Sequence, residues 1–284
     1  MKKVSFKNLV LAVGLVGMLA ACDQNSEVTP SLDTEDYSID TEIESDFDDV
    51  DQYVAEGMAG VVYSTANGKT TGWRRHLPDC ALVTHDPEAM TVTIDFGDGC
   101  ETRGGKLISG VIFITYTARK FVPGSVTTLE LRNFVVDGKL IEGKRTSENI
   151  SESLEANPSF HVLLEGGKIT FEDGAFATKE ADKTTVWVRA SNPLNDEFQI
   201  LEGSTSEGVN KKGVGYTTLI LQTIVYKNIC KLEGIHIPVV GVKQITHGDA
   251  IGTIDFGDGE CDNLVTITRG DRTETVELTR GKRD

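Results

Sequence analysis

The chain has 284 residues, a length that fits one large domain or two ordinary ones. Its 44 Asp and Glu outnumber its 28 Lys and Arg, giving a formal net charge of −16. This excess of acid argues against a nucleic-acid-binding protein, which presents a basic surface to phosphates. With 39% apolar and 25% charged residues, the composition also excludes wholesale disorder and a polytopic membrane protein.

Residues 1–21 have the layout of a secretory signal peptide. Lysines near the start precede an apolar run from Leu9 to Ala20, which is shorter than the roughly 20 residues of a membrane-spanning helix. The run leads into the sequence LAAC, which ends at Cys22 and resembles the lipobox of bacterial lipoproteins. The resemblance implies cleavage before Cys22, a diacylglyceryl group on its sulfur and usually an acyl chain such as palmitate on its amine. An ordinary cleaved signal or a hydrophobic anchor is the alternative.

The residues after Cys22 bear on location. The sequence DQNSE at 23–27 resembles the acidic export signal of surface lipoproteins in Bacteroidota. We therefore expect a lipid-anchored protein of the outer membrane, on its periplasmic or cell-surface face, with the surface favoured. The expected partners are the membrane, through the lipid on Cys22, and an unidentified protein or glycan.

Most of the negative charge lies beside this anchor. Thirteen acidic residues fall between Asp23 and Glu56, and no Lys or Arg occurs between Cys22 and Lys69. Residues 69–284 carry a net charge of only −6. Because like charges repel one another and anionic headgroups, residues 22–36 are predicted to be an acidic tether that holds the body away from the membrane.

The apolar residues that follow the tether recur at steps of three and four, the spacing of one helix face. They are Ile39, Ile43, Phe47, Val50, Val54 and Met58. The spacing predicts an amphipathic helix over 37–60 that packs on the body of the protein. A helix that binds a separate partner is the alternative.

Residues 61–284 are predicted to form an antiparallel β body, because the apolar period changes to two and turn signals are dense. The fold class is mainly β, as a large antiparallel curved sheet or two linked β-modules with an N-terminal amphipathic helix. Asp137-Gly138 predicts a two-residue hairpin turn. The apolar runs 111–117 and 217–226 predict strands covered on both faces. The predicted strands are 91–96, 111–117, 126–136, 139–147, 160–164, 167–171, 184–190, 197–202, 217–226 and 263–268.

A sequence repeat covers about 73–120 and 226–270. The sequence TIDFGDG occurs at 93–99 and again at 253–259, each time with one Cys upstream and one just downstream. Since lipid occupies Cys22, four cysteines remain for disulfides in an oxidising compartment. Of the three possible pairings, the repeat favours Cys80–Cys100 and Cys230–Cys261, so that each copy closes its own hairpin.

The aspartates of the repeat allow two interpretations. Asp98 and Asp258 are suited to bind backbone amides in Asx-turns, beside glycines that supply positive φ. The alternative is a weak Ca²⁺ site made by clustered oxygen ligands. The ligand sets would be Asp95, Asp98 and Glu101 in the first copy, and Asp255, Asp258 and Asp262 in the second.

These features together resemble a group of Bacteroidota lipoproteins that have no assigned activity. The shared features are the lipobox, the acidic helix, Cys80 leading to Thr93–Cys100, Gly105-Lys106, Ile114–Thr117, Pro123–Ser125, Asn133–Gly138, Glu142-Gly143, Gly203, Gly208–Asn210, Asp255–Gly259 and Cys261–Asn263. Glu260 departs from the pattern, which usually has a small residue there. The resemblance implies fold and location but carries no activity.

No catalytic motif stands out, since the five histidines lack metal-ligand spacing and no nucleophile motif occurs. We expect a non-enzymatic envelope protein that binds a ligand or partner through a sheet face or loops. The alternatives are a hydrolase acting on a polysaccharide or envelope polymer, and a half-barrel that carries lipid or lipoprotein as LolA-like chaperones do. A carrier would need a deep apolar concavity.

Overall fold

The computed structural model describes residues 46–47, 50–58 and 77–278. The predicted signal peptide, Cys22, the acidic tether and residues 37–45 of the predicted helix lie outside the described residues. No helix among the described residues is long and apolar enough to cross a membrane.

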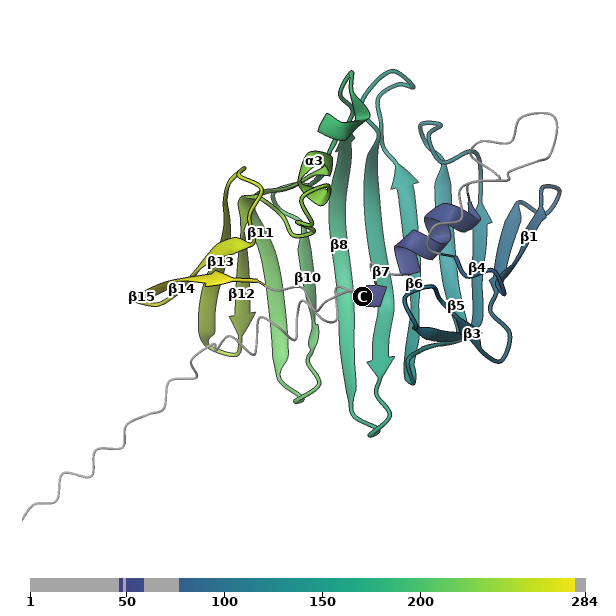
Figure 1. Ribbon diagram of the computed structural model, residues 1–284, viewed down its shortest axis with the longest axis horizontal. Coiled ribbons are helices and arrows are strands. Elements are labelled where there is room, and N and C mark those ends of the chain that lie inside the picture. The colour runs from purple at the N-terminus through teal and green to yellow at the C-terminus, as the bar shows by residue number, and fades with distance from the viewer. Residues whose placement is uncertain (1–45, 48–49, 59–76, 279–284) are drawn as a thin grey trace, which may run out of the picture.

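The described strands belong to one antiparallel sheet (Figure 1). Its order is β1-β2-β4-β5-β6-β7-β8-β10-β11-β12-β13-β14-β15, with β3 paired to β4 and β9 paired to β8 and β11. The strands are β1 Leu82–Asp86, β2 Thr91–Asp95, β3 Cys100–Glu101, β4 Leu107–Tyr116, β5 Val126–Val136, β6 Lys139–Asn149, β7 Ser159–Thr170, β8 Phe176–Val188, β9 Glu197–Ile200, β10 Thr205–Val209, β11 Gly215–Lys227, β12 Val240–His247, β13 Ala250–Asp258, β14 Leu264–Arg269 and β15 Arg272–Glu277. The predicted mainly β fold is confirmed, and both copies of the repeat lie in the same sheet.

Two strand predictions are wrong in detail. The segments 160–164 and 167–171 are one strand, β7, because Gly166 and Gly167 make a register shift against β8 rather than a turn. The runs in β4 and β11 are not covered on both faces, since Val111, Phe113 and Leu219 are only half-buried. The guanidinium of Arg132 lies 3.9 Å from the centre of the Phe113 ring and shields it in place of a second layer.

Residues 46–47 and 50–57 are helical and lie against one face of the sheet, here called the inner face (Figure 1). The ring of Tyr53 packs edge-on against Phe96 at 5.7 Å between centroids. Gly57 leaves space for Ile94, whose Cδ1 would lie 2.4 Å from a Cβ at that position. The predicted helix is present where the structure describes it, although the sequence pattern did not include the buried Tyr53. The other helical segments are η1 Pro193–Asn195 and α3 Asn228–Lys231.

The inner face carries two hydrophobic clusters near the two ends of the sheet. The N-terminal cluster contains buried Ile94, Ile112 and Phe134, together with Val50 and Tyr53 of the helix. The members of the C-terminal cluster come from β11 to β14 and the loop before β12; they are Ile220, Ile224, Ile237, Ile245, Ala250, Ile254, Phe256, Val265 and Ile267. Directly paired residues of antiparallel strands point to the same side, so the register places both clusters on one face.

Glycine bulges interrupt the pairing and permit the sheet to bend. The register of β4 shifts at Gly110 and that of β12 shifts at Gly241. Both glycines have positive φ, at 87° and 108°. A Cβ on Gly110 would lie 2.1 Å from the carbonyl oxygen of Asn133. These positions therefore require glycine for conformation and for close approach of the neighbouring strand.

The predicted turn at Asp137-Gly138 is confirmed. Both residues have positive φ, 48° and 75°, as a two-residue β5–β6 hairpin requires. The Asp137 carboxylate also accepts a hydrogen bond of 2.8 Å from the Leu107 amide, tying the turn to β4.

The disulfide prediction is confirmed, with Cys80 joined to Cys100 and Cys230 joined to Cys261. Their Cα atoms are 5.8 Å and 5.1 Å apart. The first bond ties the start of the β1–β2 hairpin to β3, and the second ties α3 to the loop after β13. Each copy of the repeat therefore contains its own disulfide bond.

We expect Gly110→Ala to destabilise the protein far more than Gly105→Ala. Both glycines have positive φ, but nothing lies within 4 Å of a Cβ at Gly105. Gly105→Ala should cost about 1–2 kcal/mol from its φ alone, and Gly110→Ala about 2 kcal/mol more because it strikes a backbone carbonyl. Denaturant unfolding measures both; equal losses would contradict the bulge argument.

Removing the first disulfide by Cys80→Ser with Cys100→Ser should lower the free energy of unfolding by about 3 kcal/mol, since the bond closes a loop of about 20 residues in the unfolded chain. Chemical unfolding under non-reducing conditions measures the loss. Mass spectrometry of an unreduced digest checks the pairing, and a peptide joining Cys80 to Cys230 would refute it.

Candidate binding face

Three lysines lie on the inner face. Lys179 and Lys183 lie four residues apart on β8, and Lys243 lies on β12, paired with Ile220 and Ile254 of the C-terminal cluster. Lys179 is only 2% exposed and Lys243 only 8%. Burying an ammonium group costs free energy unless negative or polar groups compensate it.

The backbone beside Lys179 is unusually close on both sides. Lys179 pairs with Gly167 on β7 and with Gly208 on β10, which place no side chains beside it. A Cβ on Gly208 would lie 1.9 Å from the carbonyl oxygen of Thr178, and one on Gly167 would lie 2.3 Å from that of Lys179. Glycine at these two positions is thus part of how the fold positions the lysine.

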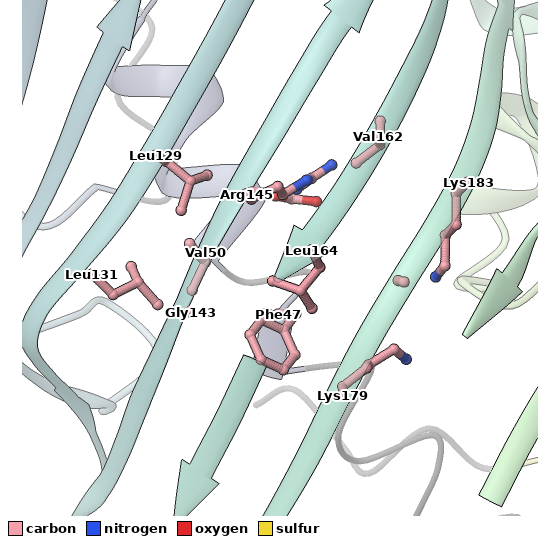
Figure 2. A pocket seen from close by; sticks show the side chains of 12 residues that line it. Phe47, Val50, Leu129, Leu131, Gly143, Arg145, Val162, Leu164, Lys179 and Lys183 are labelled. Atoms are coloured by element: carbon pink, nitrogen blue, oxygen red, sulfur yellow. The ribbon is translucent and has the colours of Figure 1, made fainter. Parts of the chain in front are cut away.

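A first cavity of about 80 Å³ lies between the helix and strands β5 to β8 (Figure 2). Phe47 and Val50 of the helix line one side, and Leu164 of β7 lines the opposite side. Figure 2 shows Lys179 and Lys183 following each other along β8 at the border of this apolar space. The Asp51–Arg145 ion pair also lines it, so the cavity combines apolar walls with two amines, a guanidinium and a carboxylate.

A second cavity of about 70 Å³ lies on the same face toward the C-terminal cluster. Ile220, Ile254 and Phe256 give it an apolar floor, and Lys243 lies among them. Lys183 lines both cavities. We call the two cavities with Lys179, Lys183 and Lys243 the lysine site.

Acidic side chains of the helix already meet cations on this face. The Asp46 carboxylate accepts hydrogen bonds of 2.6 and 2.7 Å from the Lys139 ammonium group, and Asp46 is buried. Asp51 forms an ion pair with Arg145, one turn further along the helix. The inner face is therefore a cationic surface toward the acidic N-terminal part of the chain.

Polar groups continue beyond the lysine site along the inner face. The Ser206 and Thr218 hydroxyls are buried and lie 2.6 Å apart in a hydrogen bond between β10 and β11. The ring of Tyr216 stacks on that of His247 at 6.0 Å between centroids. The Tyr216 hydroxyl donates a hydrogen bond of 3.3 Å to the Thr178 carbonyl. The middle of the sheet is thus more polar than either end.

A further lysine, Lys120, lies beside the start of β7. Burial lowers the pKa of Lys120, and its ammonium group lies 5.3 Å from the centre of the Phe160 ring. Phe121 packs against both Phe160 and Trp187. These aromatic side chains enclose the lysine stem and extend the pattern of amines set in apolar surroundings.

The aspartates singled out in the repeat form turns. The Asp95 carboxylate accepts a hydrogen bond of 2.8 Å from the Gly97 amide, and Asp255 accepts one of 2.9 Å from Gly257. Asp98 lies in the turn after β2, whereas Asp258 is the last residue of β13 and pairs with Val240. The hydrogen bonds to backbone amides that were predicted for Asp98 and Asp258 are made by Asp95 and Asp255. No group of three or more His, Cys, Asp or Glu is placed to hold a metal ion within the residues that the structure describes. The Ca²⁺ site stays a prediction.

The lysine site is not evident from the sequence pattern. A lysine at every fourth residue of a strand normally indicates a solvated face. The available signal was the phase of β8, because Lys179 and Lys183 alternate with Ala177 and Ala181 on the side that faces inward.

No protein-family model, curated protein or solved structure matches the chain. The resemblance to Bacteroidota lipoproteins therefore stays a prediction. The function must be argued from the residues of the inner face.

Lys179→Glu should destabilise the fold by about 3 kcal/mol or more, because it buries a carboxylate at a position that is only 2% exposed and that is built around an ammonium group. Lys144→Glu is the matched control, since Lys144 lies on the outer face of β6 and is half-exposed beside Glu165. Its effect should stay within about 0.5 kcal/mol. Thermal and denaturant unfolding measure both, and similar losses would contradict the electrostatic argument.

Proposed function

We propose that the protein is a lipid-anchored protein of the outer membrane that binds an anionic, amphipathic partner through the lysine site. The observation that carries the proposal is that Lys183 lines two cavities, each of which combines apolar side chains with a further lysine, Lys179 in the first and Lys243 in the second. Amines in apolar surroundings recognise a partner that has acidic groups beside apolar ones.

The two kinds of contact have different roles. Apolar side chains such as Leu164 and Ile220 supply affinity, at about 25 cal/mol per Å² of apolar surface buried. The ammonium groups of Lys179, Lys183 and Lys243 supply orientation and selectivity, because they attract the acidic groups of a partner and repel cationic ones.

The size of the cavities indicates the kind of partner. At about 80 and 70 Å³ they are far smaller than the 300–1,000 Å³ of pockets that enclose a small molecule. A segment of a protein or glycan that lies across the face and inserts a few groups fits them better than an enclosed acyl chain. This comparison favours a binding protein over the lipid-carrier alternative, and nothing in the described residues favours the hydrolase alternative.

Cys22→Ser tests the anchor. Loss of the thiol removes the site of the diacylglyceryl group, so the variant should leave the membrane fraction while the unchanged protein stays in it. Mass spectrometry of the mature N-terminal peptide should show the lipid on Cys22. A peptide that starts elsewhere or lacks lipid would contradict the anchoring part of the proposal.

The binding part is tested with 8-anilinonaphthalene-1-sulfonate, an anionic probe with an apolar body. It should bind the purified mature chain, and Lys183→Met should weaken binding about tenfold, the effect of about 1.4 kcal/mol. Lys144→Met on the outer face is the control and should bind as the unchanged chain does. Equal affinities in the two variants would overturn the assignment of the site.

A further inference from the structure

We propose that the β body docks on a lipid bilayer through one end of its sheet, where four loops expose aliphatic side chains. These loops, here called the long loops, are 117–125, 150–158, 189–196 and 228–239. Their apolar tips would enter the headgroup region of a zwitterionic bilayer, and the strands would point away from it.

The two ends of the sheet have different connections. Because the paired strands are antiparallel, the connections after β4, β6, β8 and β11 lie at one end of the sheet, and these are the long loops. Figure 1 shows α3, which belongs to the last of them, at the upper edge of the sheet. At the other end the connections are short turns, namely 137–138, 171–175, 210–214 and 248–249. Long loops held by a rigid scaffold are where proteins most often carry binding surfaces.

Every long loop exposes at least one large aliphatic side chain. The exposed residues are Val122, Ile150, Leu154, Leu194 and Leu232. None of them belongs to either hydrophobic cluster. Among the four short turns, all of which the structure describes, only 210–214 exposes such a side chain, Val214. A concentration of exposed apolar side chains at one end of the molecule marks an interaction surface.

Hydrogen bonds link the long loops to one another. The Gly124 amide donates a hydrogen bond of 2.8 Å to the Asn149 carbonyl, which joins the first loop to the start of the second. The Asn228 amide donates one of 3.0 Å to the Asp196 carbonyl, which joins the third loop to the fourth. The tips are therefore held in position, and docking costs little conformational entropy.

Arg189 makes one of the loop tips suited to a medium that lacks water. Its guanidinium donates hydrogen bonds to the carbonyl oxygens of Leu154, Glu155 and Ala156. Carbonyl groups that enter a lipid layer lose water and need a donor from the protein. A loop tip that stays in water does not need such a donor, so this arrangement favours a bilayer as the partner.

The charge of the long loops also fits a zwitterionic surface. The loops contain four basic residues, Arg119, Lys120, Arg189 and Lys231, and four acidic residues, Glu152, Glu155, Asp196 and Glu233. Their formal net charge is therefore zero, whereas residues 69–284 as a whole carry −6. This end of the acidic protein thus approaches lipid headgroups without net repulsion.

Aromatic side chains lie behind the aliphatic tips. Phe121 packs against Trp187 at 5.7 Å between centroids, and Phe198 packs against Tyr226 at 6.1 Å. Phe198 is exposed at the start of β9. Rings of Trp and Tyr favour the level of the headgroups. Aliphatic tips with aromatic rings behind them therefore match the order of layers that a bilayer presents.

A few partly exposed side chains give weak and reversible docking, at most comparable with the roughly 10⁴ M⁻¹ of a single acyl chain. Docking alone would not retain the chain on washed membranes. In the cell the lipid anchor proposed above would keep the body near the bilayer, and docking would set its orientation. This consequence rests on the proposed anchoring, whereas the docking itself does not.

The test uses the mature chain with Cys22→Ser, which cannot carry the lipid, and sedimentation with vesicles of phosphatidylethanolamine and phosphatidylcholine at about 1 mM lipid. The chain should bind. Leu154→Ser combined with Leu232→Ser should weaken binding about tenfold, which is about 1.4 kcal/mol. These side chains are 62% and 67% exposed, so the fold should tolerate both changes.

The matched control carries Leu107→Ser and Ile251→Ser at the other end of the sheet, where the side chains are 57% and 56% exposed. It should bind as the parent chain does. No sedimentation, equal losses in the two variants, or binding that requires added phosphatidylglycerol would overturn the proposal.

Hydrogen exchange gives a readout that needs no substitution. With vesicles, amides of 150–158 and 228–239 should exchange about tenfold more slowly, and those of 171–175 and 210–214 should not change. Unchanged exchange in the long loops would overturn the docking. Failure of docking with lipid found on Cys22 would refute the docking alone, and vesicle binding by a chain that carries no lipid in cells would refute the anchoring alone.

Discussion

The whole architecture depends on covering one face of a single long sheet. The buried apolar residues lie on the inner face, and a sheet cannot leave such a face in water. Within the described residues, the helix covers the N-terminal part through Val50 and Tyr53, and α3 with the loop after it contributes Cys230 and Ile237 at the other end. Lys179, Lys183 and Lys243 also line the inner face, and Lys179 and Lys243 are buried there.

The same short sequence occurs near both ends of the sheet and is stabilised in the same way. In each copy of the repeat a buried Phe, Phe96 or Phe256, follows an Asp whose carboxylate accepts a hydrogen bond from the amide of the glycine two residues later. A disulfide then ties each copy together. Each end of the sheet is stabilised by its own disulfide and hydrophobic cluster. The strands in the middle of the sheet therefore contain polar residues that contribute less to the two clusters.

Much of the fold follows from the sequence, for identifiable physical reasons. The strand Val126–Val136 and its turn were predictable because Asp137-Gly138 tolerates positive φ, and the disulfides were predictable because the repeat paired the cysteines. The burial of the inner-face lysines was not predictable, because periodicity indicates which residues share a face of a strand but not which face is buried. The strand β7 was predicted as two strands, because glycines that form a bulge and glycines that form a turn look alike in sequence.

The most direct test of the account is the rate of reductive methylation of each lysine in the mature chain, measured by mass spectrometry. If the middle of the inner face is covered as the account requires, Lys179 and Lys243 react far more slowly than Lys144 and Lys168 on the outer face. Comparable rates at all four amines would contradict it, because Lys179 and Lys243 would then be open to solvent.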